Sequence, residues 1–166
     1  IENSLAGRVA DIHYLLPKYK LQIRGEYFLP VEHFLLGKPD AKIEDIKYVR
    51  SHAQAISQCQ NIIVKRKFKS IISVDTAGSA KDLAEGKDKS IAAIASNLSA
   101  KMYNLKILEK NIEDEKGNVT RFLIMGKNIE QPEYTNDKKF ITSCIFRLKS
   151  EPSALYKSLG GFATNQ

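Results

Sequence analysis

Helix-like and strand-like hydrophobic patterns alternate along this chain, and the alternation favours an α/β fold. The clearest unit is residues 70–74 (SIISV), whose β-branched residues predict a buried strand. Asp75 or Thr76 follows at once and can cap a helix that ends at Gly86. A strand that feeds directly into a helix is the repeating unit of α/β proteins, so we expect that class rather than an all-α or all-β protein.

A second helix is predicted just before this unit. Ser51 and Gln54 have the spacing of a capping box, in which the two side chains satisfy free N–H groups at a helix start. With a helical period, the apolar residues that follow would all face inward. These residues are Ala55, Ile56, Cys59, Ile62 and Ile63.

The remaining elements are predicted from the same patterns. They are a helix over residues 5–16 capped by Ser4, strands over 21–24 and 26–29 with a bend or bulge at Gly25, a strand over 46–49, a helix from Ser90 through Met102, and strands over 105–108 and 121–125. Further along the chain, residues 128–138 predict a linker, residues 140–148 a strand and residues 152–159 a helix that ends at Gly160.

Charge narrows the classes of partner. The formal net charge is +7 and the isoelectric point about 9.3, which suits either a nucleic acid or an anionic substrate. The densest basic run, residues 65–69, lies at the end of a predicted helix, where cations are favourable. No nucleic-acid-binding motif accompanies it, so we expect no nucleic-acid partner. No run of 18 apolar residues occurs, so we expect no membrane span.

The cysteines and histidines argue against a metal site. Cys59 and Cys144 lie far apart in apolar contexts, which favours a buried, reduced thiol at each and a cytoplasmic protein. His13, His33 and His52 are scattered without ligand spacing. We expect no metal and, in the absence of a dinucleotide fingerprint or phosphate-binding glycine loop, no cofactor. The chain begins without an initiator Met or a signal peptide, so we expect it to be part of a longer reading frame.

Residues 118–122 form the sharpest candidate site. Neighbouring residues of a strand face opposite sides, so Thr120 and Phe122 would share one side and Arg121 the other. Asn118 precedes the strand. The alternative is a Thr that suits a strand and an Arg in a surface ion pair.

Three further segments carry polar groups that could bind a ligand. Thr76 and Ala77 lie at a predicted helix N-terminus, whose free N–H groups suit a carboxylate. Ser51 and Gln58 lie about two helical turns apart, about 10 Å along the axis. Residues 2–4, Glu2, Asn3 and Ser4, precede the first predicted helix. In each case ordinary capping remains the alternative.

Taken in order, these segments resemble the prephenate dehydratase family. The matching blocks are residues 2–4 (ENS), Gly25-Glu26, residues 51–59 (SHAQAISQC), residues 75–80 (DTAGSA), residues 93–96 with Tyr103, residues 112–114 followed by 118–122 (NVTRF), and residues 142–143 through 152–156. The last block is similar to the opening of an ACT regulatory domain. Because the blocks keep their order over nearly the whole chain, chance is a poor explanation.

The resemblance implies a fold, an activity and a set of site residues. The fold would be a two-lobed α/β fold like that of periplasmic binding proteins, with an incomplete first lobe and the first βα unit of an ACT domain. Residues 1–127 would be the catalytic region, with about 5–90 in the second lobe and about 91–127 in the returning part of the first. Residues 128–138 would be a linker and residues 139–166 a truncated ACT domain.

The implied activity is the decarboxylating dehydration of prephenate to phenylpyruvate, in phenylalanine synthesis. The implied catalytic residues are Thr120 as proton donor or relay, with Glu2, Asn3 and Gln58. The implied substrate-binding residues are Ser51, Thr76, Ala77, Asn118, Arg121 and Phe122. With strand edges left open, we also expect association into a homo-oligomer.

The chain departs from the family pattern at two positions. Ser153 stands where the family usually has Gly in its effector motif, which disfavours inhibition by phenylalanine, and Gly117 stands where many members have Asn. Two other functions remain open. One is a non-catalytic module that binds an aromatic acid or amino acid, and the other is a regulatory protein that pairs through its ACT-like end.

Overall fold

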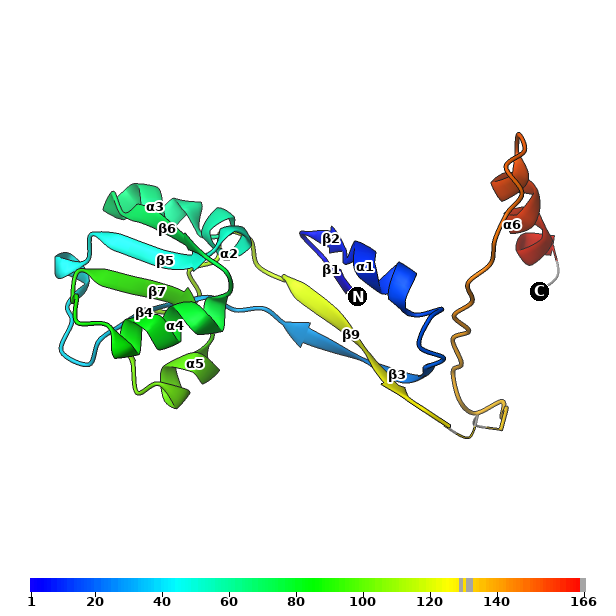
Figure 1. The fold of residues 1–166 in the computed structure, drawn as a ribbon, viewed down its shortest axis with the longest axis horizontal. Coiled ribbons are helices and arrows are strands. Elements are labelled where there is room, and N and C mark those ends of the chain that lie inside the picture. Colours follow the sequence, from blue (N-terminus) through cyan, green and yellow to red (C-terminus); the bar gives the residue numbers. More distant parts are fainter. Residues whose placement is uncertain (129, 131–132, 165–166) are drawn as a thin grey trace.

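The computed structural model describes residues 1–128, 130 and 133–164 (Figure 1). Two β-sheets lie side by side along its long axis, and a separate C-terminal helix follows them. Helices accompany both sheets, so the expected α/β class is confirmed. In the described part of the chain, no helix is long and apolar enough to cross a membrane.

The larger sheet has five strands in the order β6-β5-β7-β4-β8. The strands are β4 (Phe34–Gly37), β5 (Tyr48–His52), β6 (Lys69–Ser73), β7 (Ile91–Ala95) and β8 (Lys106–Glu109). β5 pairs in parallel with β6 and β7, whereas β4 runs antiparallel to β7 and β8. The connecting helices are η1 (Ile43–Asp45), α2 (Ala53–Ser57), α3 (Gln60–Arg66), α4 (Thr76–Glu85) and α5 (Asn97–Met102).

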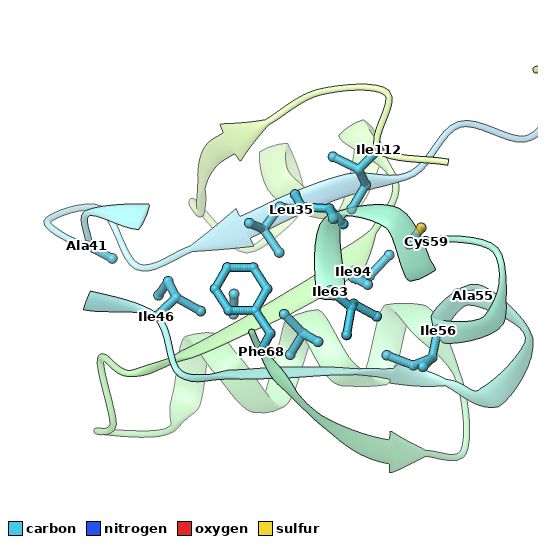
Figure 2. Packing of buried hydrophobic residues seen from close by; sticks show 13 residues of the cluster. Leu35, Ala41, Ile46, Ala55, Ile56, Cys59, Ile63, Phe68, Ile94 and Ile112 are labelled. Carbon is cyan, nitrogen blue, oxygen red and sulfur yellow. The ribbon is translucent and has the colours of Figure 1, made fainter. Parts of the chain in front are cut away.

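Apolar side chains fill both faces of this sheet. On one face, residues of α2 and α3 pack with Phe68 and with Leu35 and Ile94 of the sheet (Figure 2). On the other face, residues of α4 and α5 pack against Phe34 and Leu36. Successive residues of β4 thus enter opposite cores, as strand geometry requires. A sheet buried on both faces is the rigid part on which neighbouring loops are held.

The smaller sheet has four strands in the order β2-β1-β9-β3. They are β1 (Glu2–Asn3), β2 (Gly7–Arg8), β3 (Gln22–Pro30) and β9 (Val119–Gly126), with the short helix α1 (Ala10–Leu15) after β2. β9 lies between β1 and β3, so residues at the start of the chain are hydrogen-bonded to residues near position 120. The register of β3 shifts between Ile23 and Gly25, which confirms the expected irregularity at Gly25.

Two segments connect the sheets, residues 31–33 and residues 110–118 (Figure 1). They are joined to each other: Val31 N donates to Asn118 O at 2.8 Å, and Ile112 N donates to His33 O at 3.0 Å. Polar side chains on these segments are therefore held in fixed positions between the two sheets.

The N-terminal prediction is wrong in detail. Ser4 does not cap a helix; its hydroxyl accepts from Val119 N at 2.9 Å. Residues 2–8 form the hairpin of β1 and β2, and α1 begins only at Ala10. Pairing with β9 decides the conformation here, and a local helical pattern cannot reveal such a partner.

The helix predicted from Ser51 is also revised. β5 continues through Ser51, and the cap of α2 is His52, whose Nδ1 accepts from Gln54 N. The predicted single helix is two helices, α2 and α3, separated at Gln58 and Cys59. All five residues expected to face inward are buried.

Residues 90–102 are not one helix. They form β7, the centre of the larger sheet, followed by α5 with Ser96 as its cap. Both faces of β7 are buried, so its sequence lacks the alternation that marks a half-buried strand. The alanines of β7 have a high helix propensity, so the segment was predicted as helical. Conversely, β6, predicted as buried, is an edge strand with Ile72 61% exposed.

The two sheets draw on other segments than the ranges 5–90 and 91–127. Residues 22–30 lie in the smaller sheet, and residues 91–109 lie in the larger one. Residues 140–148 form no strand, since a strand needs a pairing partner and this segment contacts none within the described residues. The helix predicted to end at Gly160 is α6 (Ala154–Thr164), which continues through both glycines. The expected linker over 128–138 includes 129, 131 and 132, which lie outside the described residues.

Candidate active site

Pairing of β1 with β9 places Asn3 directly opposite Thr120. Asn3 Nδ2 donates to Thr120 Oγ1 at 3.0 Å and to Asn118 Oδ1 at 2.6 Å. The Asn3 Oδ1 atom accepts from the backbone N–H groups of Leu5 and Ala6, at 3.1 Å and 2.8 Å. A backbone N–H can only donate, so these two bonds fix which end of the Asn3 amide faces Thr120.

Asn118 extends the cluster to the larger sheet. It is 3% exposed, and its Nδ2 donates to Gln58 Oε1 at 3.2 Å. Gln58 lies where α2 ends, immediately before the break that precedes α3. Four of the predicted site residues thus meet in one hydrogen-bonded cluster, which we call the polar relay. Its members are Asn3, Gln58, Asn118 and Thr120.

One further residue, His33, joins this relay, although the sequence does not predict it as a site residue. His33, 7% exposed, lies just before β4, and its Nε2 is 2.9 Å from Gln58 Oε1. His33 N also donates to Glu113 Oε2 at 3.0 Å. The sequence around His33 gives no sign of this contact with Gln58. The contact forms only because α2 ends beside residues 31–33 in the folded protein.

An open hollow of about 420 Å³ adjoins the relay at Gln58. One side is formed by Leu5 and Ala6 of the N-terminal turn. The other is formed by the end of α2 and by the acidic loop, through Gln54, Ser57, Gln58, Asp114 and Glu115. The hollow therefore lies between the N-terminal turn and the end of α2, and Gln58 is the relay residue that lines it.

Glu2 and Arg121 lie on the other side of the smaller sheet from Thr120. Arg121 Nη2 is 2.6 Å from Glu26 Oε2, and its Nη1 is 3.4 Å from Glu2 Oε1. The hydrogen bond to Glu26 raises the pKa of Arg121 above its ordinary value. Glu2 and Arg121 were expected at the site, but the structure places them in an ion pair that braces β1, β9 and β3 rather than beside the Thr120 hydroxyl.

Phe122 shares the Thr120 side of β9 and pairs across the ladder with Tyr27. Phe122 is 47% exposed and Tyr27 57% exposed. This aromatic surface lies next to the relay without a hydrogen bond to it, so it is available for an apolar contact.

Ser51 is fully buried and makes an internal hydrogen bond. Its Oγ donates to Ile94 O on the neighbouring strand at 2.7 Å. It therefore holds β5 against β7 rather than facing the hollow.

Thr76 and Ala77 lie at the N-terminus of α4, and neither is hydrogen-bonded to the relay within the described residues. Asp75 is the cap, and its side chain accepts from Gly78 N at 2.6 Å. Within the described chain, the N–H groups of Thr76 and Ala77 donate to no protein group. α2, α4 and α5 all begin at this carboxyl edge of parallel strands, which is where open α/β sheets bind ligands.

The acidic loop is pinned by its own side chains. Asp114 accepts from Gln60 N at 2.7 Å and from Asn61 N at 3.0 Å, so it caps α3 from a distant segment. Burial raises the pKa of the nearby Cys59 thiol to about 12, and the carboxylates of Asp114 and Glu113 add to the rise. Cys59 is therefore a neutral core thiol, not a nucleophile.

The relay consists of Asn, Gln and Thr side chains, and the carboxylates of Asp114 and Glu115 line the hollow beside it. Among residues 1–128, 130 and 133–164 there is no group of three His, Cys, Asp or Glu side chains able to hold a metal ion. The Thr120 hydroxyl accepts from Asn3 and makes no donation to the described protein, so its own proton can be directed at a ligand. Such an arrangement can assist proton transfer to a departing oxygen.

The fold and the relay define an α/β protein with a candidate acid–base site between two sheets. Comparison with known proteins identifies the family. The family model described as prephenate dehydratase matches residues 1–130, and this chain belongs to the prephenate dehydratase family.

Individual relatives agree with that assignment. The chain is 42% identical to a bifunctional N-acyl-homoserine lactone acylase/prephenate dehydratase of Komagataeibacter europaeus, covering 98% of this chain and 58% of that protein. It is also 42% identical to the prephenate dehydratase of Methanocaldococcus jannaschii, over 98% of this chain and 59% of that protein. A solved prephenate dehydratase from Arthrobacter aurescens, in complex with L-Phe, has a TM-score of 0.78 at 25% identity, over 95% of this chain and 53% of that one. The chain therefore spans less than two thirds of the length of these relatives.

Proposed function

We propose that the protein containing this chain is a prephenate dehydratase, which converts prephenate to phenylpyruvate in phenylalanine synthesis. The observation that carries the proposal is the relay, which leaves the Thr120 hydroxyl free to donate while Asn3 holds its oxygen. Family membership and relatives whose names include prephenate dehydratase support it.

The chemistry suits such a donor. The ring carboxylate leaves as carbon dioxide, and its bonding electrons enter the ring. The hydroxyl group at the opposite ring carbon leaves, and a proton delivered to it turns the departing hydroxide into water. Hydroxide is a poor leaving group, so a hydrogen-bond donor aimed at that oxygen lowers the barrier. Thr120 has this role in our proposal, with Asn3 and Gln58 orienting the reacting groups.

Two kinds of contact would hold the substrate. The free N–H groups of Thr76 and Ala77 suit one of the two carboxylates, and the basic surface favours the approach of a dianion. Asn118 and Phe122 would contact the substrate near Thr120. We assign Glu2, Ser51 and Arg121 to support of these elements, because each is engaged within the protein.

Substitution of Thr120 tests the proposal. In the full-length protein, Thr120→Ala should lower kcat by about 10²–10⁴-fold while prephenate still binds, because the lost group acts mainly on the departing oxygen. Thr120→Ser keeps the hydroxyl and should retain much of the activity. Phenylpyruvate formation measures turnover, and calorimetry with prephenate measures binding. An alanine variant with wild-type kcat would reject Thr120 as the donor. A wild-type protein that binds prephenate without turning it over would instead favour a binding module.

The domain organisation is part of the proposal. We infer that the two sheets represent the lobes of a fold like that of periplasmic binding proteins, and that residues 1–127 are its catalytic region. Residues 128–138 then form a linker to an ACT domain that begins at residue 139, in which α6 is the first helix. The separation of α6 from both sheets supports this division.

Association is also proposed. The Thr120 side of the smaller sheet exposes Tyr27, Leu29, Phe122 and Ile124, each 43–57% exposed. A homo-oligomer that covers such a face would remove apolar area from water. Sedimentation of the full-length protein as a compact monomer would contradict it. Both cysteines are free, which fits a cytoplasmic enzyme, although Cys144, expected to be buried, is exposed.

We further propose that phenylalanine does not inhibit this protein through residues 139–166. Ser153, where the family usually has Gly, has a φ of 64°, in the left-handed region that favours glycine. The serine side chain occupies a position that glycine leaves open. Calorimetry should show no binding of phenylalanine to the full-length protein, and Ser153→Gly is the variant that could restore it.

A further inference from the structure

His33 is fixed in space by its backbone. Its N–H donates to Glu113 Oε2 at 3.0 Å, and its carbonyl accepts from Ile112 N at 3.0 Å. These bonds tie the two segments that cross between the sheets, and β4 begins at the next residue. The backbone hydrogen bonds of His33 therefore fix the position of its imidazole beside Gln58.

The polarity of the relay can be followed from one end. The N–H groups of Leu5 and Ala6 require Asn3 to present its oxygen to them, so the Asn3 amide nitrogen donates to Asn118 Oδ1. Asn118 must then donate through its nitrogen, and the group that accepts is Gln58 Oε1. Each amide in the series is thus oriented by the one before it.

This polarity determines the tautomer of His33. Gln58 Oε1 is an acceptor, so His33 Nε2, 2.9 Å away, must carry a hydrogen. With its oxygen held by Asn118 and His33, Gln58 directs its NH₂ group elsewhere. Gln58 lines the hollow, and its Nε2 donates to no group of the described protein.

We propose that His33 is a positioning residue, which holds Gln58 so that the amide NH₂ of Gln58 donates into the hollow. The ligand that this donor suits carries an anionic or carbonyl oxygen. Without His33, one of the two bonds that fix the amide is lost, and rotation by half a turn would present an oxygen to that ligand instead. A kinetic test of this inference rests on the proposed function, because it needs turnover of prephenate. A spectroscopic test of the His33 ring and the Gln58 amide does not.

The kinetic test compares variants of the full-length protein. His33→Leu removes the donor and should raise KM for prephenate about tenfold or more, because an amide oxygen facing an anionic oxygen opposes binding. His33→Gln places an amide N–H near the lost Nε2 and should recover much of that loss. In a Gln58→Leu background, His33→Leu should add little, because its effect passes through Gln58. Additive effects in this double-mutant cycle would overturn the proposal.

The spectroscopic test needs no turnover. Nitrogen chemical shifts of the wild-type His33 ring should show a hydrogen on Nε2 at neutral pH, and the side-chain amide signal of Gln58 should move in His33→Leu but stay near its wild-type position in His33→Gln. A neutral ring with its hydrogen on Nδ1 alone would overturn the inference. If wild-type protein fails to turn over prephenate while these signals behave as expected, the proposed function fails and the positioning role stands.

Discussion

At the scale of single residues, Cys59 has the clearest physical signature. It is fully buried, and its pKa is raised from 9.0 to about 12. The unfolded chain therefore loses this proton at lower pH than the folded protein does. The contribution of the neutral Cys59 thiol to the free energy of unfolding is complete below about pH 9. This contribution is lost as the pH rises toward 12.

We expect the free energy of unfolding to fall between pH 9 and pH 11, with a contribution from Cys59 of about 1 kcal/mol per pH unit. Urea unfolding followed by circular dichroism measures it. Cys59→Ala should be less stable at pH 8 but should show a shallower decline above pH 9. Cys144→Ser, which alters an exposed thiol, is the matched control. Equal slopes in all three proteins would contradict the burial argument.

The sequence was informative about residue identity but less so about residue orientation. Strand alternation correctly separated Thr120 from Arg121, since period 2 is a property of any strand. It could not place Glu2 with Arg121, because that contact depends on β1 pairing with β9 over more than 100 residues. His33 was missed for the same reason. The position of a side chain relative to a distant segment is not encoded in local spacing.

At the scale of elements, β4 is packed closely at its last residue. A Cβ added to Gly37 would lie 2.7 Å from Leu108 Cδ1 and 3.2 Å from Ala41 Cβ. The two contacts come from different elements, Leu108 from β8 and Ala41 from the turn before η1. Gly37 thus permits β8 and the turn before η1 to approach the strand together.

Gly37→Ala should lower the free energy of unfolding by about 1–3 kcal/mol, because overpacking forces side chains out of their preferred rotamers. Gly25→Ala is the control, since its added Cβ would meet only Ile124 at an ordinary 3.9 Å. Chemical unfolding of both variants gives the comparison. A Gly37→Ala protein as stable as Gly25→Ala would show that Leu108 repacks freely.

A second element is capped from outside its own sequence. Asp114 accepts from two N–H groups at the start of α3, which has no side-chain cap of its own. Asp114→Ala should lower the free energy of unfolding by about 1–2 kcal/mol, within the usual range for loss of a helix cap. Asp114→Asn keeps an acceptor and should cost less. Thermal unfolding distinguishes the two, and a larger loss in the Asn variant would argue against capping.

The elements show where local patterns succeed and fail. The helix capped by Asp75 was predictable, because its cap and its end are both local. β7 was mistaken for a helix because a strand buried on both faces has no alternation to detect. The strand expected over 140–148 did not form, since strand formation depends on a partner as well as on propensity.

At the scale of the whole molecule, the C-terminal part is separate from the sheets. No helix or strand occurs between β9 and α6 in the described residues, and exposed lysines occur there, among them Lys127, Lys138 and Lys139. Proteases cut extended, exposed backbone much faster than backbone paired in a sheet.

Brief trypsin treatment should therefore cut first within residues 127–149 and leave a core that ends near residue 127. Mass spectrometry of the fragments locates the cut. Lysines in structured segments, such as Lys101 in α5, serve as internal controls. Early cleavage at Lys101, before any cut after residue 126, would contradict the separation.

The paired crossing segments have a mechanical consequence. A rotation of one sheet against the other about residues 31–33 and 110–118 would displace each atom in proportion to its distance from that axis. Asn118 and His33 lie on the axis, so their bonds to Gln58 would change little. Leu5 and Gln54 line the hollow from outside these two segments, one beside each sheet, and would separate more. Such a rotation would widen the hollow for ligand entry and release, while the hydrogen bonds of Gln58 to His33 and Asn118 stay in place.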